Sequence, residues 1–289
     1  MKFAVCFCIH SGDLEIKALL LAASLRKHWP ATIELFACVP QDPQFGGLST
    51  NTAQILDSLG VRVTSVCNPI GPDYPIANKL LCLDVKTGAD RVIFLDSDIM
   101  ALVPVSECEL AATFGDGFVA KPADLNTSTL QSNEWEAVYG TCGAIVPLLT
   151  VTTTVSHEVM PPYFNSGVIA TASNSDFGAL WSHYFAVVLQ KHNHLGRLHV
   201  FDQIPLSVAI AKSGARITII DSSWNFPAHL IPLGKTPPIL CHYHWPEIIL
   251  REARLITAMK EITSTAPGVT DAIESSPAWS GAAKALKGI

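Results

Sequence analysis

Short apolar runs alternate with segments of helical periodicity along the first hundred residues. Runs of large, often β-branched side chains without polar alternation are typical of strands buried on both faces. Strands are expected at 2–9, 33–39, 61–66 and 91–95, and helices at 14–28, 50–59 and 75–87. This order predicts an α/β fold with a mostly parallel sheet and helices on both faces.

The pattern weakens from 103 to about 160, where a short helix carrying Trp135 and Tyr139 is one of the few signals. Residues 163–170 are expected to form a turn that enters a strand. Further strands are expected at 216–220 and from Ile239 to the histidines His242 and His244, and further helices at 175–192, 203–213 and 246–262. The Ser-, Pro-, Ala- and Gly-rich tail that ends at Ile289 is compatible with a short helix, an arm to a partner or disorder. Asn174 or Ser175, and Ser11 or Asp13, are the expected caps of the helices that follow them.

The strand at 91–95 ends at two carboxylates, Asp96 and Asp98, on either side of Ser97. Alternate strand residues share a face, so both carboxylates would point the same way. Like charges at a buried strand end need a cation, and a hard divalent ion such as Mg²⁺ or Mn²⁺ shared with a diphosphate would supply one. The alternative is a surface turn with two solvated carboxylates.

Composition narrows the class of protein. The net charge is −6 without a basic cluster, which argues against nucleic acid as a partner. Hydrophobic residues make up 49% and charged residues 15%, which predicts a large core and leaves peripheral membrane contact open. Eight scattered cysteines are expected to be reduced and buried, which favours a cytoplasmic location. No apolar run reaches membrane-spanning length.

Five motifs follow one another along the chain: Lys79, Val92-Ile-Phe-Leu-Asp-Ser-Asp-Ile99, Phe164-Asn-Ser-Gly-Val168, Asp202-Gln203 and Leu240-Cys-His-Tyr243. Their order resembles that of the retaining glycosyltransferases of family 8, which include glycogenin and lipopolysaccharide galactosyltransferases. The resemblance implies a GT-A fold, a Rossmann-like mixed sheet. It also implies a nucleotide-sugar donor, expected to be a UDP-sugar, and transfer of a hexose to a glycan, glycolipid or protein acceptor.

The resemblance also implies roles for individual residues. Asp96, Asp98 and His242 would hold Mn²⁺ (or Mg²⁺), with His244 as second choice for the histidine. The nucleotide and diphosphate would contact Cys8, Ile9, His10, Lys79, Asp96, Ser97 and Asp98. Asn165, Asp202 and Gln203 would face the sugar. One departure is Trp245-Pro246-Glu247, where the family often has a lysine that touches the diphosphate.

Each of these residues also has a simpler interpretation. His242 could be a core histidine, Lys79 a solvated helix residue, and Asn165 part of a turn. Asp202 could be an N-cap, with or without a sugar contact.

By the same resemblance, 1–105 would form the nucleotide-sugar half, 106–250 the acceptor and metal-completing half of the same domain, and 251–289 a C-terminal helix and tail.

Two other functions remain open from the sequence. A sugar nucleotidyltransferase would need a Gly-rich, Arg- or Lys-bearing loop after the first strand, and His10-Ser11-Gly12-Asp13 does not supply it. A non-catalytic scaffold that binds nucleotide sugars is favoured only by the missing lysine. Which sugar, which acceptor and which oligomeric state apply is left open.

Overall fold

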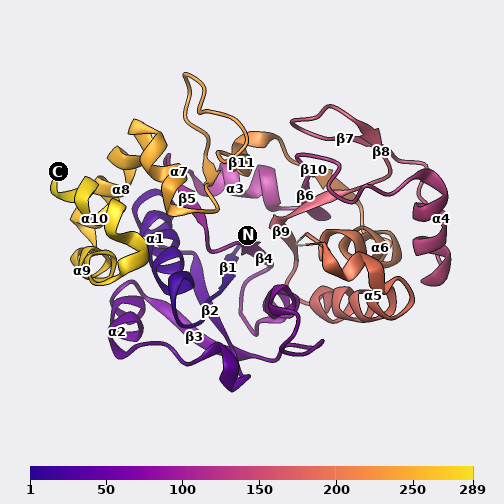
Figure 1. Ribbon diagram of the computed structural model, residues 1–289, viewed down its shortest axis with the longest axis horizontal. Helices are drawn as coiled ribbons and strands as arrows, with labels where there is room; N and C mark the ends of the chain where they lie inside the picture. Colours follow the sequence, from indigo (N-terminus) through magenta and orange to yellow (C-terminus); the bar gives the residue numbers. More distant parts are fainter. Residues whose placement is uncertain (199, 289) are drawn as a thin grey trace.

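The computed structural model describes residues 1–198 and 200–288. A seven-stranded sheet runs through the middle of the molecule in the order β10-β6-β9-β4-β1-β2-β3 (Figure 1). Its strands are β1 (Phe3–Cys8), β2 (Glu34–Pro40), β3 (Val61–Val66), β4 (Arg91–Leu95), β6 (Phe118–Pro122), β9 (Phe164–Ala172) and β10 (Ile217–Ile219). β9 is antiparallel to β4 and β6, and the other pairings are parallel. The predicted mixed, mostly parallel sheet is confirmed.

Alternate residues of the central strands enter two separate cores. On β1, Phe3, Val5 and Phe7 join one core, whereas Ala4 and Cys6 join the other. All residues of β1 and β4 are buried, as their continuous apolar runs predict. Each face of the sheet must therefore be covered by helices.

Ten helices pack on the two faces within the described residues (Figure 1). They are α1 (Asp13–His28), α2 (Thr50–Ser58), α3 (Glu107–Phe114), α4 (Ser132–Thr141), α5 (Phe177–Lys191), α6 (Gln203–Ser213), α7 (Pro246–Arg251), α8 (Ala253–Thr265), α9 (Pro267–Ser275) and α10 (Ser280–Lys287). The first core contains buried side chains of α1, α3 and α7 to α10. The second core contains those of α4, α5 and α6.

Two small sheets complete the fold. β11 (Phe226–Pro227), β12 (Leu240–His242) and β5 (Ile99–Ala101) form one, with β12 antiparallel to β5 and parallel to β11. β7 (Val151–Thr152) and β8 (Val159–Met160) form a hairpin. Because β5 follows Asp98 directly, the three-stranded sheet brings the late histidine strand against the aspartate turn.

Several local expectations are wrong. The helix expected at 75–87 is two 3₁₀ turns, Pro75–Lys79 and Cys82–Asp84. Nearly every residue from Ala77 to Leu83 is buried, which leaves no polar face for an amphipathic helix. The helix expected at 246–262 breaks at Glu252, whose extended backbone separates α7 from α8.

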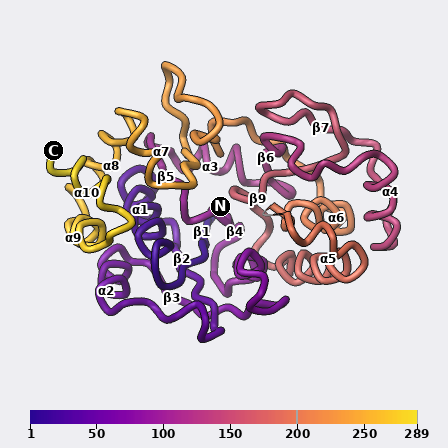
Figure 2. Tube along the Cα trace, in the orientation of Figure 1, coloured from indigo at the N-terminus to yellow at the C-terminus, as the bar shows by residue number. Residues whose placement is uncertain are grey.

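The helix caps and the tail also differ from expectation. Gly12 and Asp176 are the N-cap residues of α1 and α5, and the carboxylate of Asp84 accepts the Gly178 and Ala179 N–H groups at the start of α5. The tail is ordered as α9 and α10, which lie with α8 beside α1 and α2 (Figure 2). Val269, Ile273 and Trp279 are fully buried there, and this apolar face explains the order.

All eight cysteines are free thiols, as expected, and Cys67 and Cys108 are exposed rather than buried. Among residues 1–198 and 200–288, no helix is both long and apolar enough to cross a bilayer.

Candidate active site

The aspartate motif is a tight turn between β4 and β5, at the carboxyl end of β4. The Ile99 N–H donates to the Asp96 carbonyl oxygen at 3.2 Å, and the Asp96 N–H donates to the Gly167 carbonyl of β9 at 2.8 Å. The Ser97 hydroxyl donates to the Cys8 carbonyl at the end of β1. The strand ends at Leu95 as expected, and Asp96 and Asp98 face one cavity because of this turn, not because strand alternation puts them on one face.

This cavity of about 190 Å³ lies where the strand order reverses between β1 and β4. Ligands of open α/β sheets bind at such switch points. Its lining includes most of the residues predicted to bind the nucleotide and diphosphate: Cys8, His10, Lys79, Asp96, Ser97 and Asp98. Ile9 is fully buried and lies outside this lining. Leu14, Pro75, Ile76 and Asn78 complete it and were not predicted.

Lys79 is buried and paired with carboxylates, which excludes the solvated helix lysine. Its Nζ lies 2.9 Å from Asp202 Oδ2 and 3.3 Å from Asp96 Oδ1, and it donates to the Ser166 hydroxyl at 2.9 Å. Burial opposes the charge of Lys79, but the two carboxylates outweigh it and raise its pKa above the ordinary value. The Asp202 carboxylate accepts from Lys79 and Ser166 instead of capping α6.

The residues predicted as metal ligands lie near the Lys79–Asp202 pair. They are Asp96, Asp98, His242 and the alternative His244. His242 Nε2 lies 2.9 Å from Asp98 Oδ1 and 4.0 Å from Asp96 Oδ2, and His244 Nδ1 lies 3.6 Å from Asp98 Oδ2. One ligand atom from each of Asp98, His242 and His244 lies within 4.8 Å of the others. The two imidazole rings stack with centroids 3.9 Å apart. His242 and His244 are therefore both in reach of Asp98.

The donor set fits a divalent cation in its charge and ligand types. Burial raises the pKa of Asp96, and the adjacent Asp98 adds to this, although Lys79 pulls in the other direction. The pKa of Asp98 is lowered, because the neighbouring His242 outweighs the effect of burial. Lys79 pairs with two carboxylates, Asp96 and Asp202, and among the described residues Asp98 pairs only with the two histidines. Carboxylate oxygens with imidazole nitrogen are ligands that Mn²⁺ and related ions accept.

Asn225, which the sequence reasoning missed, contacts the imidazole of His242. Asn225 Oδ1 lies 3.1 Å from His242 Nδ1, and Asn225 Nδ2 donates to Asn165 Oδ1 at 2.9 Å. Asn225 lies outside any periodic run, one residue before β11. In the pairing of β11 with β12, Pro227 lies opposite His242, and the side chain of Asn225, two residues earlier, reaches the imidazole.

Asn165 belongs to strand β9, not to the turn that its sequence suggests. Its Oδ1 also accepts the Gly167 N–H at 2.8 Å, and its Nδ2 donates to Asp124 Oδ2 at 3.2 Å. Asn165 and Gln203 line a second cavity of about 290 Å³, together with His229, His244 and Trp245. Gln203 is buried, and its Oε1 has no hydrogen-bond partner among the described residues. Asp98 lines the first cavity and His244 the second, and Asp98 Oδ2 lies 3.6 Å from His244 Nδ1.

Lys17 of α1 connects to the histidine segment from the other side. Its Nζ donates to the His244 carbonyl oxygen at 2.7 Å and pairs with Asp13 Oδ2 at 3.1 Å. Asp13 in turn accepts from the Trp279 indole N–H. This contact supports His244, whose φ of 59° is in the left-handed region.

Comparison with known structures agrees with this fold. The galactosyltransferase LgtC, solved with donor and acceptor sugar analogues, is 16% identical with a TM-score of 0.59, covering 96% of this chain and 99% of its own. The glycosyltransferase GlyE of Streptococcus pneumoniae is 17% identical with a TM-score of 0.50, covering 92% and 64%. An active-site mutant of LgtC gives 15% identity and a TM-score of 0.52, covering 83% and 87%. These likenesses confirm the predicted GT-A fold.

Sequence comparison supplies the family. A search of curated protein sequences finds no match. The profile of a family described as the Rhodobacterales glycosyltransferase domain matches residues 5–214, which include Lys79, both aspartates, Asn165 and Asp202-Gln203. The predicted resemblance to galactosyltransferases such as LgtC is confirmed at the level of the fold, and this chain belongs to the Rhodobacterales glycosyltransferase family.

Proposed function

We propose that this glycosyltransferase moves a hexose from a UDP-sugar to a sugar-bearing acceptor, with a divalent cation and with retention of the anomeric configuration. The observation that carries the proposal is the cluster of Asp98, His242 and His244, since Asp98 also lines the cavity that Lys79 and Asp96 line. A metal ion and the buried Lys79 together would neutralise the negative charge of a nucleoside diphosphate. Retention rests on the family resemblance.

Each group has a defined task in this proposal. Asp96, Asp98 and His242, with His244 within reach, would hold Mn²⁺ (or Mg²⁺), which as a Lewis acid would stabilise the charge of the leaving diphosphate. The backbone around Cys8 and His10 would contact the nucleotide. The Asp202 carboxylate, paired with Lys79 at 2.9 Å, and the Gln203 amide would stabilise positive charge that develops on the sugar.

The second cavity is assigned to the sugar and the acceptor. His244, one of the candidate metal ligands, lines this cavity together with Asn165 and Gln203. Trp245 borders it with 55% of its surface exposed, which offers a flat aromatic face of the kind on which sugar rings pack. The acceptor is accordingly expected to present a sugar at the transfer site.

A donor panel tests the proposal. Release of the nucleotide from UDP-, GDP-, ADP- and TDP-sugars would be followed with Mn²⁺ or with EDTA, using wild type and Asp98→Asn. Release from a UDP-sugar that needs both Mn²⁺ and Asp98 is expected. Binding of a donor without any release would instead support a non-catalytic scaffold, and formation of UDP-sugar from UTP and a sugar phosphate would support a nucleotidyltransferase.

A further inference from the structure

Asn225 is buried at the edge of the candidate metal site formed by Asp98, His242 and His244. It is 1% exposed, and the preceding Trp224 is buried with ring contacts to Phe114 and Trp29 at centroid distances of 5.0 and 6.4 Å. The Ser223 carbonyl accepts the Ile239 N–H at 2.8 Å, which ties this segment to the chain that enters β12. The position of the Asn225 side chain is therefore set by the fold.

The direction of its amide follows from a backbone group. The Gly167 N–H can only donate, so the Asn165 side-chain atom that faces it must be the oxygen. That oxygen also faces the Asn225 amide at 2.9 Å, so Asn225 must present its NH₂ group there. The Asn225 oxygen is then the atom that points at His242 Nδ1.

This chain of hydrogen bonds determines which nitrogen of His242 carries the proton. Because Asn225 Oδ1 only accepts, His242 Nδ1 must donate, and in the neutral ring Nε2 then bears the lone pair. Nε2 faces Asp98 Oδ1 at 2.9 Å. Two lone-pair atoms at that distance repel each other unless a proton or a metal ion lies between them.

We propose that Asn225, oriented by Asn165, is a positioning residue that fixes His242 in the tautomer whose Nε2 can bind the divalent cation together with Asp98. The inference rests on the proposed function in that the cation is taken to be divalent and resident. It gives Asn165 a role toward the metal ligand that is separate from any contact with the sugar. Mutation of the residue that hydrogen-bonds to a metal-ligating histidine typically lowers metal affinity by about 10- to 100-fold.

The test is a titration of the purified protein with Mn²⁺, in which free Mn²⁺ is measured by EPR in the absence and presence of UDP. Unfolding by urea is measured on the same samples. The variants are Asn225→Leu, Asn225→Asp, Asn165→Leu and, as a reference for loss of the ligand itself, His242→Gln. No sugar is present, so contacts of Asn165 with the donor hexose do not contribute.

Asn225→Leu, which removes the acceptor, is expected to weaken Mn²⁺ binding by about 10- to 100-fold. Asn165→Leu frees the Asn225 amide to rotate and is expected to weaken binding as well, although Asn165 touches no ligand atom of the cluster. Asn225→Asp keeps an acceptor for Nδ1 but sets an oxygen against Asn165 Oδ1. It is therefore expected to lose stability while it keeps wild-type or stronger Mn²⁺ affinity.

If Asn225 had only a structural role, Mn²⁺ affinity would fall whenever the free energy of unfolding falls, in every variant. Asn225→Asp would then lose Mn²⁺ affinity as it loses stability, and that result overturns the inference. Unchanged Mn²⁺ affinity in Asn225→Leu overturns it too, while wild-type binding that is lost in His242→Gln leaves the proposed metal site standing. Failure of wild type to bind Mn²⁺ with or without UDP would overturn the metal site and the inference together.

Discussion

Lys79 Nζ lies 2.9 Å from Asp202 Oδ2, which joins two residues that are 123 positions apart in the sequence. The lysine comes from the 3₁₀ turn Pro75–Lys79 and the carboxylate from the start of α6. Their side chains are 10% and 1% exposed. This buried pair connects the cavity assigned to the nucleotide with the helix that carries Gln203.

Replacement of Lys79 by methionine keeps the length of the side chain and removes its charge. The carboxylates of Asp202 and Asp96 would then lie buried without their cation. Loss of one partner from a buried ion pair costs about 3–5 kcal/mol, so the free energy of unfolding in EDTA is expected to fall by about that amount. Urea denaturation measures it.

The double variant Lys79→Met/Asp202→Asn provides the control. Since it removes both charges, it is expected to be more stable than Lys79→Met alone. Equal stability of the single and double variants would mean that the pair does not interact as the structure indicates.

Gly167 is required by the close approach of three site residues. A Cβ at this position would lie 2.8 Å from His242 Cε1, 3.0 Å from Asn165 Oδ1 and 3.0 Å from Asp96 Oδ2. Gly167→Ala should therefore displace the histidine, cost about 1–3 kcal/mol of stability and weaken Mn²⁺ binding. Calorimetric titration with Mn²⁺ and urea denaturation measure the two effects.

Gly140 in α4 is the matched control, because a Cβ there meets nothing within 4 Å. Gly140→Ala is expected to add about 0.5–1 kcal/mol of stability and to leave Mn²⁺ affinity unchanged. Equal losses of Mn²⁺ affinity in both alanine variants would refute the steric explanation.

The sheet and half of the site could be predicted from the sequence, because they depend on local patterns. The apolar run 91–95 predicts a buried strand, and the carboxyl ends of β1 and β4 place His10, Asp96 and Asp98 at one edge. The late histidines follow a third apolar run. Their contact with Asp98 depends on the short antiparallel pairing of β12 with β5. This pairing requires a turn at Asp96–Asp98, between β4 and β5.

Other parts of the structure could not be predicted from the sequence, for physical reasons. Asn225 lies in a segment without periodicity, and its contact with His242 joins two residues from segments that are paired over only two residues. Asp202 was compatible with a cap because N-caps are often aspartate, and only the proximity of Lys79 decides otherwise. The tail has a weak sequence signal, but its buried face is completed by α1 and α2.

Trp279 tests whether the C-terminal helices are part of the core. Its side chain is fully buried, and its indole N–H donates to Asp13. Trp279→Ala is expected to cost about 3–5 kcal/mol of stability, as for other buried large-to-small replacements. Thermal or urea unfolding checks this, with Trp279→Phe as the milder variant. Wild-type stability of Trp279→Ala would contradict the ordered tail.

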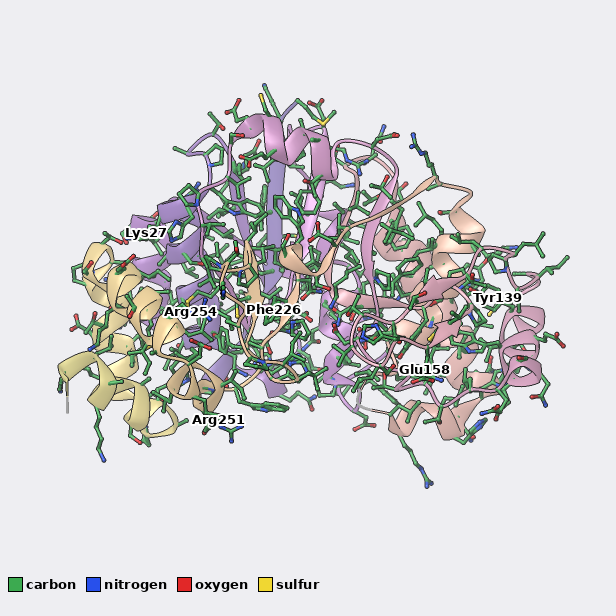
Figure 3. All side chains as sticks on the ribbon, turned by 90° about the horizontal axis from the view of Figure 1, so that it is seen from above. Lys27, Tyr139, Glu158, Phe226, Arg251 and Arg254 are labelled. Carbon is green, nitrogen blue, oxygen red and sulfur yellow. The ribbon has the colours of Figure 1, made fainter. Side chains whose placement is uncertain are left out.

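Lys17 supports the His244 backbone, so Lys17→Met should weaken Mn²⁺ binding by about tenfold, as for other outer supports of metal ligands. Lys27 of the same helix is the control. It points toward the C-terminal helices (Figure 3), with its Nζ 3.8 Å from Glu261 Oε2. Lys27→Met removes only an exposed ion pair and should leave Mn²⁺ affinity unchanged. Equal effects of both variants on Mn²⁺ titration would argue against a specific role of Lys17.

The most direct test of the central claim is the thermal stability of the protein with UDP-sugars, measured in Mn²⁺ and in EDTA for wild type and Asp98→Ala. A ligand that binds only the folded state at 100 times its Kd adds about 2.7 kcal/mol of stability. The account predicts a rise in Tm with a UDP-sugar that requires Mn²⁺ and is abolished in Asp98→Ala. A rise of equal size in EDTA, or none with any UDP-sugar, would contradict a metal-dependent donor site.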